Sequence, residues 1–390
     1  MVILVTGSKG FIGRHLCLAL RRLGTHEVLE FDVDQPGERL DELAQRAEVV
    51  FHLAGVNRPE SEAEFERGNA ALTRTLCEKL KAGGRRAAVV LSSSIQAALD
   101  NPYGRSKKGA EEAVMAYHRE TGAVVRIYRL PNVFGKWSRP NYNTVVATFC
   151  HNLQRGLPVQ INNRETALRL VYIDDVIRAF VGALGALRMT TAGQGRDGGE
   201  AGCYAEVQPV HETTVGGLYD VLAGFREAQA KCLVPNVADP LVKKLYTTYL
   251  SFQDPKDLAQ PVAMKTDARG WLFELIKSPY AGQIFVSKTK PGITRGNHYH
   301  DTKVEKFCVI QGEGIIRFRH ALSEPAGEAG KGTAAIIEYR VSDGDIRVVN
   351  IPPGYTHSIE NTGRGDMITL FWANEIFDPE QPDTYSLAVQ

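Results

Sequence analysis

The pattern of apolar and polar positions predicts strands that alternate with helices in the first part of the chain. Residues 2–6 form a short apolar run, a glycine turn follows, and residues 11–23 have helical periodicity that ends at Gly24. Further strands are expected over residues 27–32, 48–55, 86–94 and 123–135, and further helices near residues 65–82 and 105–120. This alternation predicts an α/β fold in which helices cover both faces of a parallel sheet.

The pattern changes after about residue 190. Residues 190–202 are polar and glycine-rich, which predicts a loop, and residues 215–229 have the periodicity of one more amphipathic helix. Short strand-like runs separated by turn residues follow over residues 283–289, 305–312, 314–320, 334–341, 346–354 and 366–374. Such regular short strands predict a small all-β barrel or sandwich.

The length of 390 residues suggests at least two domains. We place the boundary near residues 250–262, which gives a first domain over 1–250 and a second over 262–390. Lysine and arginine together number 46 against 45 acidic residues, so no strong net charge favours nucleic acid or an anionic membrane surface as a partner.

The chain start and the cysteines bear on the cellular compartment. No run approaches the roughly 18 apolar residues that span a bilayer, and the first residues lead directly into a glycine loop without a cationic leader. The six cysteines are scattered and include no C-x-x-C pair, which favours reduced thiols. We therefore expect a cytoplasmic protein.

A glycine pattern, Gly7-x-x-Gly10-x-x-Gly13, lies between the first expected strand and helix. Glycine permits the tight turn and the close approach of a pyrophosphate, whose charge then meets the N–H groups at the helix N-terminus. The alternative is a mere tight turn, which this context disfavours. The loop therefore predicts a dinucleotide site.

Two further elements are compatible with hydride transfer. Tyr103 and Lys107 are four residues apart and would share one helix face, where a nearby ammonium favours the ionised phenol. Ser92, Ser93 and Ser94 end an expected strand, where ligands gather in open α/β sheets. On its own, the Tyr/Lys pair could equally belong to a solvated helix.

Together these elements resemble the short-chain dehydrogenase/reductases, and in particular their extended, sugar-nucleotide members. The motifs HLAG (52–55), RLPNVFG (129–135) and YIDDV (172–176), with Asn69, also occur where that family has them. The resemblance implies a Rossmann-type, doubly wound domain in which Tyr103 donates the proton, Lys107 holds the nicotinamide ribose and Ser94 orients the ketone. Ser93 remains possible in that last role. The implied cofactor-binding residues are Gly7, Gly10, Phe11, Ile12, Gly13, Asp32, Leu53, Ala54, Tyr103 and Lys107.

The form of the nicotinamide cofactor and the substrate contacts stay open at this point. Asp32 ends the second expected strand, where it could bind an adenosine ribose and favour NADH, whereas Lys9 and Arg14 point to a 2′-phosphate. Arg169 could contact the diphosphate of a nucleotide sugar, and Asn132 could contact the nucleotide or the sugar. Both residues could equally be structural.

A second set of chemically active residues lies in the C-terminal part. His298 and His300 are separated by one residue, so they can share one face of a strand, and Glu305 and His357 follow. Three imidazoles and a carboxylate suit zinc, iron or manganese. With Gly292, Gly312, Pro352, Gly354 and Asn361, the spacing resembles both cupin motifs. This implies a cupin barrel with a metal, for which we expect Zn²⁺. The alternative is a cupin without metal.

The combined chain is similar to the CapF-type enzymes of capsule and O-antigen biosynthesis, with motifs such as NRPE, FGKW and NHYHDTKVEKF. The resemblance implies a bifunctional enzyme, with NADPH as cofactor and NADH possible. Its cupin part would epimerise C3 of UDP-2-acetamido-2,6-dideoxy-hexos-4-ulose, and its reductase part would reduce the C4 ketone to UDP-2-acetamido-2,6-dideoxy-L-talose, on the way to UDP-N-acetyl-L-fucosamine. A homodimer through the cupin domain is expected.

Two other functions are alternatives to this one. The reductase could be the only catalyst, with the cupin as a dimerisation module. A transcriptional repressor that senses the nicotinamide cofactor is disfavoured, because Ser94, Tyr103 and Lys107 are all present and no basic helix is apparent. The base that would abstract the C3 proton cannot be chosen among Tyr299, Asp301 and Lys303.

Overall fold

The computed structural model describes the chain except residues 143, 192–199 and 324–334. Packing divides the described residues into two compact units. The first unit comprises Met1–Ala223 and Lys244–Gln253, and the second comprises Gly224–Lys243 and Asp254–Gln390. Most of the loop expected over residues 190–202 lies outside the described residues.

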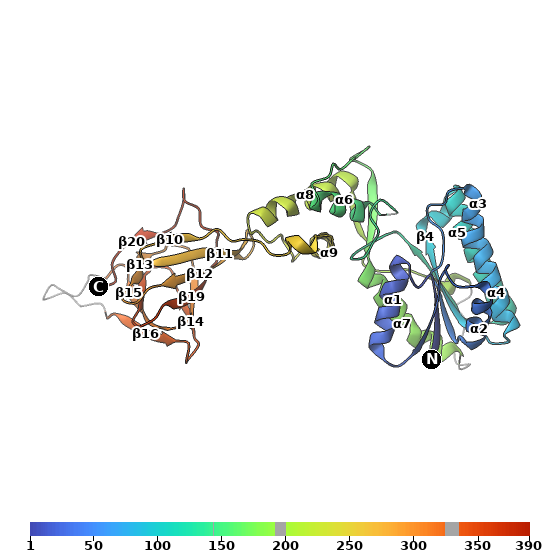
Figure 1. The fold of residues 1–390 in the computed structure, drawn as a ribbon, viewed down its shortest axis with the longest axis horizontal. Coiled ribbons are helices and arrows are strands. Elements are labelled where there is room, and N and C mark those ends of the chain that lie inside the picture. Colours follow the sequence, from blue (N-terminus) through green and yellow to red (C-terminus); the bar gives the residue numbers. More distant parts are fainter. Residues whose placement is uncertain (143, 192–199, 324–334) are drawn as a thin grey trace. The chain divides into compact units, whose positions relative to one another are not determined.

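The first unit is an α/β sandwich around a six-stranded parallel sheet in the order β2-β1-β3-β4-β5-β8 (Figure 1). A small sheet, β6-β7-β9, accompanies it. The strands are β1 (Val2–Thr6), β2 (Glu27–Phe31), β3 (Val49–His52), β4 (Ala88–Ser94), β5 (Val125–Leu130), β6 (Asn132–Phe134), β7 (Ala167–Tyr172), β8 (Tyr204–Ala205) and β9 (His211–Thr214). The helices are α1 (Phe11–Leu23), α2 (Gly37–Arg46), α3 (Glu62–Phe65), η1 (Glu66–Ala71), α4 (Leu72–Ala82), η2 (Ile95–Ala98), α5 (Pro102–Thr121), α6 (Val145–Gln154), α7 (Ile173–Thr191) and η3 (Glu200–Cys203). Two further helices, α8 (Val215–Ala230) and α9 (Pro240–Leu250), each have residues in both units. The expected Rossmann-type sheet is confirmed.

The central strands are apolar on both faces because helices cover both faces. Leu4, Val50 and Val89 are fully buried and pack into one core with the inward stripes of α2, α4 and α5. One expected strand is divided: residues 123–135 form β5 and β6, which belong to different sheets. Pro131 lies at the break, and a proline has no N–H to continue a ladder.

The second unit is all-β in the main, with two antiparallel sheets in the orders β10-β11-β12-β19-β14-β17 and β16-β15-β18-β13-β20. After a short helix, η4 (Pro255–Asp257), come β10 (Lys265–Asp267), β11 (Gly270–Ser278), β12 (Gly282–Thr289), β13 (Thr294–Tyr299), β14 (Glu305–Gln311), β15 (Glu313–His320), β16 (Ile337–Ser342), β17 (Val348–Ile351), β18 (Tyr355–Asn361), β19 (Met367–Ala373) and β20 (Tyr385–Ser386). Phe307, Ile316 and Phe371 lie in the core between the sheets. This arrangement confirms the expected cupin-type barrel.

The sequence pattern missed several barrel strands. Apolar alternation did not predict β13 or β18, because their inward positions hold polar side chains, although the paired histidines did indicate a strand at His298. His300 follows the end of β13, and Asn297 has a positive φ of 61° at a bulge between Gly296 and His298. The His298 and His300 rings lie 5.0 Å apart, as expected for alternate positions of an extended segment, and the bulge lies before both of them.

Two features of composition have structural counterparts. All six cysteines, which belong to the described residues, are free thiols, as expected. Within the described ranges of the chain, no helix is both long and apolar enough to cross a membrane.

Candidate functional site

The loop between β1 and α1 requires glycine for steric reasons. Gly7 has a φ of +69°, and a Cβ on it would lie 2.6 Å from the backbone nitrogen of Ala54. A Cβ on Gly13 would lie 2.1 Å from the carbonyl oxygen of Gly7. Because both positions exclude a side chain, the loop folds tightly against the start of α1, where N–H groups face outward to an anion.

A cavity of about 840 Å³ lies beside this loop, at the carboxyl ends of the parallel strands. Ligands bind at this edge of open α/β sheets. Of the candidates from the sequence, those that line it are Gly7, Lys9, Gly10, Phe11, Ile12, Gly13, Arg14, Leu53, Ser93, Ser94, Tyr103, Lys107 and Asn132. The fold thus brings the glycine loop and the Ser/Tyr/Lys group together.

Ser94 and Ser93 have different surroundings. Burial raises the pKa of Tyr103, and a hydrogen bond with the Ser94 side chain partly offsets this increase. The Ser93 hydroxyl instead donates to the buried Glu111 carboxylate at 2.5 Å. Ser94 also accepts a hydrogen bond from the Gln96 N–H at 3.2 Å. This geometry favours Ser94 over Ser93 as the residue beside the reacting group.

Lys107 is a buried cation. Its Nζ donates to the Ser92 carbonyl at 3.4 Å and lies 5.9 Å from the centre of the Tyr103 ring. Burial lowers the pKa of Lys107 to about 8, although the negative charge of Glu111 opposes this shift. Gly55 leaves room for the ammonium, since a Cβ there would lie 3.1 Å from Nζ. Lys107 can therefore favour ionisation of Tyr103 at close range.

Three of the residues expected at the cofactor and substrate sites do not line the cavity. Asp32 accepts hydrogen bonds from the backbone N–H groups of Lys9 at 2.7 Å and Val33 at 2.8 Å. Ala54 packs against the glycine loop through its backbone. The Arg169 side chain is 3.7 Å from Glu212, while its carbonyl accepts a hydrogen bond from Asn132.

The cavity also contains cationic and aromatic residues that sequence reasoning did not select. Arg58, Trp137, Arg139 and Tyr142 line it. Arg58 donates to the carbonyl of Asn141 at 3.5 Å, and the Arg139 guanidinium lies 5.1 Å from the centre of the Tyr142 ring. Arg58 and Trp137 belong to the NRPE and FGKW motifs of the resemblance, but no role was assigned to them from the sequence. These motifs and their position after expected strands were the signals that could have suggested a binding role.

The metal-ligand set expected from the sequence forms one cluster in the barrel. The ligand atoms of His298, His300, Glu305 and His357 all lie within 4.8 Å of one another. His298 and His357 are opposite each other in the β13–β18 ladder, whereas Glu305 begins β14 in the other sheet. The two sheets together therefore create the cluster.

Electrostatics within the cluster favour a cation. Burial alone would raise the pKa of Glu305, but the neighbouring imidazoles of His300 and His357 lower it to about 2. Burial, with the neighbouring imidazoles, lowers the pKa of His298 to about 4. At neutral pH the cluster thus combines a carboxylate with at least one neutral imidazole.

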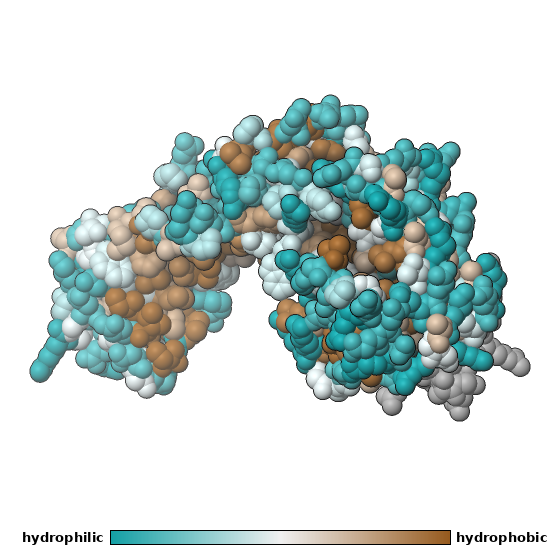
Figure 2. Space-filling model, turned by 45° about the vertical axis from the view of Figure 1, so that its right-hand side comes forward, coloured by the Kyte–Doolittle hydropathy of each residue, from teal (hydrophilic) through white to brown (hydrophobic). Residues whose placement is uncertain are grey.

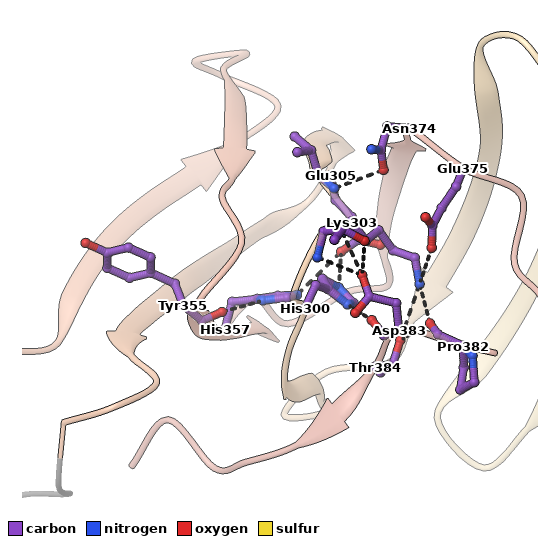
Figure 3. A network of polar contacts seen from close by, with 12 residues as sticks. His300, Lys303, Glu305, Tyr355, His357, Asn374, Glu375, Pro382, Asp383 and Thr384 are labelled. Atoms are coloured by element: carbon purple, nitrogen blue, oxygen red, sulfur yellow. Dashed lines mark hydrogen bonds and ion pairs between the residues drawn. The ribbon is translucent and has the colours of Figure 1, made fainter.

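The residues fit a divalent metal. His357 Nε2 is buried and has no hydrogen-bond partner among the described residues, although Glu305 Oε2 lies 3.4 Å away. His300 Nε2 lies 3.3 Å from the same oxygen (Figure 3). Three imidazoles and one carboxylate are a common donor set for zinc. A metal between these atoms would satisfy the unpaired nitrogen.

The fold and both sites define a class of protein in which a short-chain dehydrogenase/reductase domain precedes a cupin-type barrel. Residues 3–194 match the NAD dependent epimerase/dehydratase family, and residues 265–385 match the polysaccharide biosynthesis C-terminal domain. UDP-glucuronic acid 4-epimerase from Bacillus cereus, with 20% identity and a TM-score of 0.53, covers 65% of this chain and 98% of its own, and shares the fold alone.

Two relatives extend over the whole chain. The UDP-2-acetamido-2,6-beta-L-arabino-hexul-4-ose reductase of Pseudomonas aeruginosa is 42% identical over 390 residues, which are 100% of this chain and 99% of the relative. The crystal structure of the capsular polysaccharide assembling protein CapF from Staphylococcus aureus has a TM-score of 0.87 and 41% identity, with 100% of both chains covered. This chain belongs to the CapF-type family, which confirms the resemblance found in the sequence.

Proposed function

We propose that this chain is a bifunctional, NADPH-dependent UDP-sugar enzyme. Its substrate is UDP-2-acetamido-2,6-dideoxy-hexos-4-ulose: the barrel (residues 262–390) epimerises C3, and the reductase domain (residues 1–250) reduces the C4 ketone. The product is UDP-2-acetamido-2,6-dideoxy-L-talose, in the UDP-N-acetyl-L-fucosamine pathway of capsule or O-antigen synthesis. The main support is that Ser94, Tyr103 and buried Lys107 line one cavity together with the glycine loop. The name of the Pseudomonas relative supports the substrate class.

The reduction needs a proton donor at the carbonyl oxygen. When bound, the reduced nicotinamide supplies the hydride that C4 of the ketone accepts. The Ser94 hydroxyl donates a hydrogen bond to the carbonyl oxygen, and Tyr103 transfers its phenolic proton to that oxygen. Lys107 holds the nicotinamide ribose, and its ammonium stabilises the phenolate that remains.

The choice of NADPH over NADH is supported by the hydrogen bonds of Asp32. Its two carboxylate oxygens already accept N–H groups of Lys9 and Val33, which leaves less capacity for ribose hydroxyls. Lys9 and Arg14 line the cavity and provide positive charge for a 2′-phosphate. Measured affinities for the two cofactors test this choice; tighter binding of NADH would contradict it.

The diphosphate of the sugar nucleotide requires cationic contacts inside the cavity. Arg58 and Arg139 line the cavity, whereas Arg169 does not. An arginine guanidinium can form paired hydrogen bonds to phosphate oxygens. We therefore assign the diphosphate to Arg58 and Arg139, and a contact of Asn132 with the sugar remains part of the proposal.

The barrel is proposed to hold Zn²⁺ through His298, His300, Glu305 and His357. When bound, such a metal supplies positive charge that favours an enolate. The candidates for the C3 base, Tyr299, Asp301 and Lys303, flank the expected ligands in sequence. The Tyr299 ring stacks on Tyr385 at 5.2 Å, and Lys303 Nζ donates to the Pro382 carbonyl at 2.5 Å.

One ketone explains why two sites occur in one chain. The hydrogen at C3 is acidic only while C4 is a carbonyl, because the carbanion is then delocalised as an enolate. Reduction at C4 removes this acidity and fixes the new C3 configuration. The reversible epimerisation would thus be drawn forward by the reduction.

A Tyr103→Phe variant in D₂O separates the two activities. With reduction removed, the keto sugar persists, and we expect the barrel to exchange C3 hydrogen for deuterium, seen by NMR. A second substitution, His357→Ala, should abolish the exchange while nicotinamide binding persists. His320→Ala is the control, since His320 lies in β15 outside the cluster. Exchange that survives His357→Ala would refute a role for the histidine cluster.

An alternative function is a plain UDP-4-keto-sugar reductase whose barrel serves dimerisation. The outer face of the six-stranded sheet in the barrel supports a role in dimerisation. On it, cross-strand neighbours form a continuous apolar row: Phe273, Val286, Leu370, Cys308 and Val348. Figure 2 shows hydrophobic residues, coloured brown, on the surface of the second unit. Such a face supports a homodimer under either function. Absence of C3 exchange in the Tyr103→Phe protein, with normal reduction in the wild type, would favour the alternative.

A further inference from the structure

The C-terminal segment, residues 382–389, packs against the strand that holds the first cluster histidine. β20 pairs with β13, so that Ser386 lies opposite His298 and Tyr385 opposite Tyr299. Beyond β20, the Leu387 N–H donates to the Asn297 carbonyl at 2.9 Å. The last residues of the chain are therefore part of the wall around the cluster.

Asp383 binds the loop between two of the cluster residues. Its carboxylate accepts backbone N–H groups from Asp301 at 2.9 Å, Thr302 at 3.0 Å and Lys303 at 2.7 Å. It also accepts the Thr302 hydroxyl at 3.0 Å. Partial burial alone would raise the pKa of Asp383, but these hydrogen bonds hold it well below its usual range. The carboxylate thus fixes residues 301–303, which connect His300 to Glu305.

The backbone of Asp383 contacts the cluster itself. Its carbonyl oxygen lies 2.6 Å from Nδ1 of His300, and Nε2 of the same ring lies 3.3 Å from Glu305 Oε2 (Figure 3). A carbonyl only accepts, so Nδ1 holds the proton and the lone pair of the neutral ring is on Nε2. One residue therefore determines both the tautomer and the direction of His300.

Lys303 also binds the C-terminal segment, through hydrogen bonds of its side chain. Its Nζ donates to the Pro382 carbonyl at 2.5 Å and to the Thr384 hydroxyl at 3.4 Å, and it lies 3.4 Å from Glu375. The side chain is buried, so these partners replace the water that its ammonium would otherwise have. Lys303 and Asp383 thus bind each other's segments.

We propose that Asp383 is a positioning residue of the barrel's metal centre, with its carboxylate fixing residues 301–303 and its carbonyl orienting His300 toward the metal. Ligand histidines commonly donate their second N–H to such a partner, and loss of the partner costs about 10–100-fold in metal affinity. The inference rests on the metal centre put forward under the proposed function.

The test compares Asp383→Asn with Asp378→Asn in the metal-stripped full chain. Asp378 belongs to the same C-terminal stretch, is exposed, and accepts only the Glu380 N–H, at 2.9 Å, among the contacts found in the described residues. An amide side chain cannot accept at two oxygens, so Asp383→Asn loosens the loop. We expect zinc affinity, measured by competition with a chromogenic chelator, to fall about 10-fold or more for Asp383→Asn and less than about twofold for Asp378→Asn.

A purely structural role predicts a different pattern. It lowers the unfolding temperature of the metal-free Asp383→Asn protein but leaves zinc affinity of the folded chain and the Co²⁺ absorption spectrum as in the wild type. That result would overturn the inference. If wild-type protein binds no divalent metal, the metal centre itself is refuted, which is a distinct outcome.

Lys303→Met provides a second test that leaves Asp383 intact. It removes the ammonium contacts to Pro382 and Thr384 while retaining the apolar stem. Zinc affinity should fall several-fold, and the Co²⁺ spectrum should shift in the same direction as for Asp383→Asn. Unchanged affinity and spectrum in both variants would contradict the inference.

Discussion

The two sites bury charge in opposite senses. In the reductase domain, Lys107 is a buried cation whose pKa falls to about 8 through burial. In the barrel, Glu305 is a buried carboxylate whose pKa, raised by burial, is brought down to about 2 by His300 and His357. A buried charge is stable only with a partner of opposite sign. The first site therefore favours an anion such as a tyrosinate, and the second favours a metal cation.

The sites also differ in how the chain assembles them. Tyr103 and Lys107 are one helical turn apart, and α5 alone sets their spacing. The barrel cluster draws on β13, β14 and β18, which belong to two sheets. Substitutions in the first site should therefore affect mainly the rate of reduction, whereas loss of the second site should also lower the stability of the barrel. The following predictions test this difference, from the largest expected effect to the smallest.

Tyr103→Phe should remove most of the reductase activity. Without the phenolic proton, the rate of ketone reduction should fall about 10²–10⁴-fold while nicotinamide affinity changes little. Steady-state kinetics with a UDP-4-keto sugar measure this. Tyr117→Phe is the control on the same helix, since its hydroxyl donates to the Ala87 carbonyl; it should cost about 1 kcal/mol of stability and leave the rate unchanged. Equal rates in both variants would contradict the assignment.

Removal of divalent metal should destabilise the barrel selectively. At free zinc 100-fold above its dissociation constant, binding contributes about 2.7 kcal/mol, which a chelator removes. Scanning calorimetry of the full chain should show a lower unfolding temperature for the barrel, while the nicotinamide affinity measured by titration should be unchanged. If the chelator weakened nicotinamide binding and left the unfolding temperature of the barrel unchanged, the proposed metal site in the barrel would be contradicted.

Gly13→Ala should weaken nicotinamide binding without affecting the barrel. The new methyl group would meet the Gly7 carbonyl, and such overpacking costs about 1–3 kcal/mol, or about 5- to 150-fold in affinity. Fluorescence titration measures the loss. In Gly182→Ala on α7, the added Cβ meets no atom within 4 Å, so binding should be unchanged. Normal affinity in Gly13→Ala would show that the loop is only a turn.

Nicotinamide affinity should decrease as the pH rises through about 8. Because the pKa of Lys107 is lowered to about 8, its ammonium predominates below that pH and is lost above it. The decrease is about 10-fold at most per pH unit, since one unit above the pKa leaves about one-tenth protonated. Lys107→Met should abolish the pH dependence, and Lys108→Met, at an exposed neighbour, should retain it. A flat wild-type profile would exclude Lys107 as the titrating group.

Local patterns in the sequence predicted much of the fold and site. The glycine loop and the Tyr103–Lys107 pair depend on spacings within one loop or helix, so their geometry follows from covalent structure. The barrel strands β13 and β18 were missed because apolar alternation fails where ligands face inward. Arg58 and Arg139 were missed because their approach depends on how separate loops fold.

By itself, the sequence determined the order of the two domains, the parallel sheet, the antiparallel barrel and the residue types at both sites, because each depends on periodicity or short spacing. The tertiary structure decided which serine meets Tyr103, and it placed Asp32 and Arg169 outside the cavity. It also brought Asp383 to His300 across 83 residues of sequence. Such contacts form only when strands that are distant in sequence pair and exclude water, and a local sequence pattern does not predict which distant strands will pair.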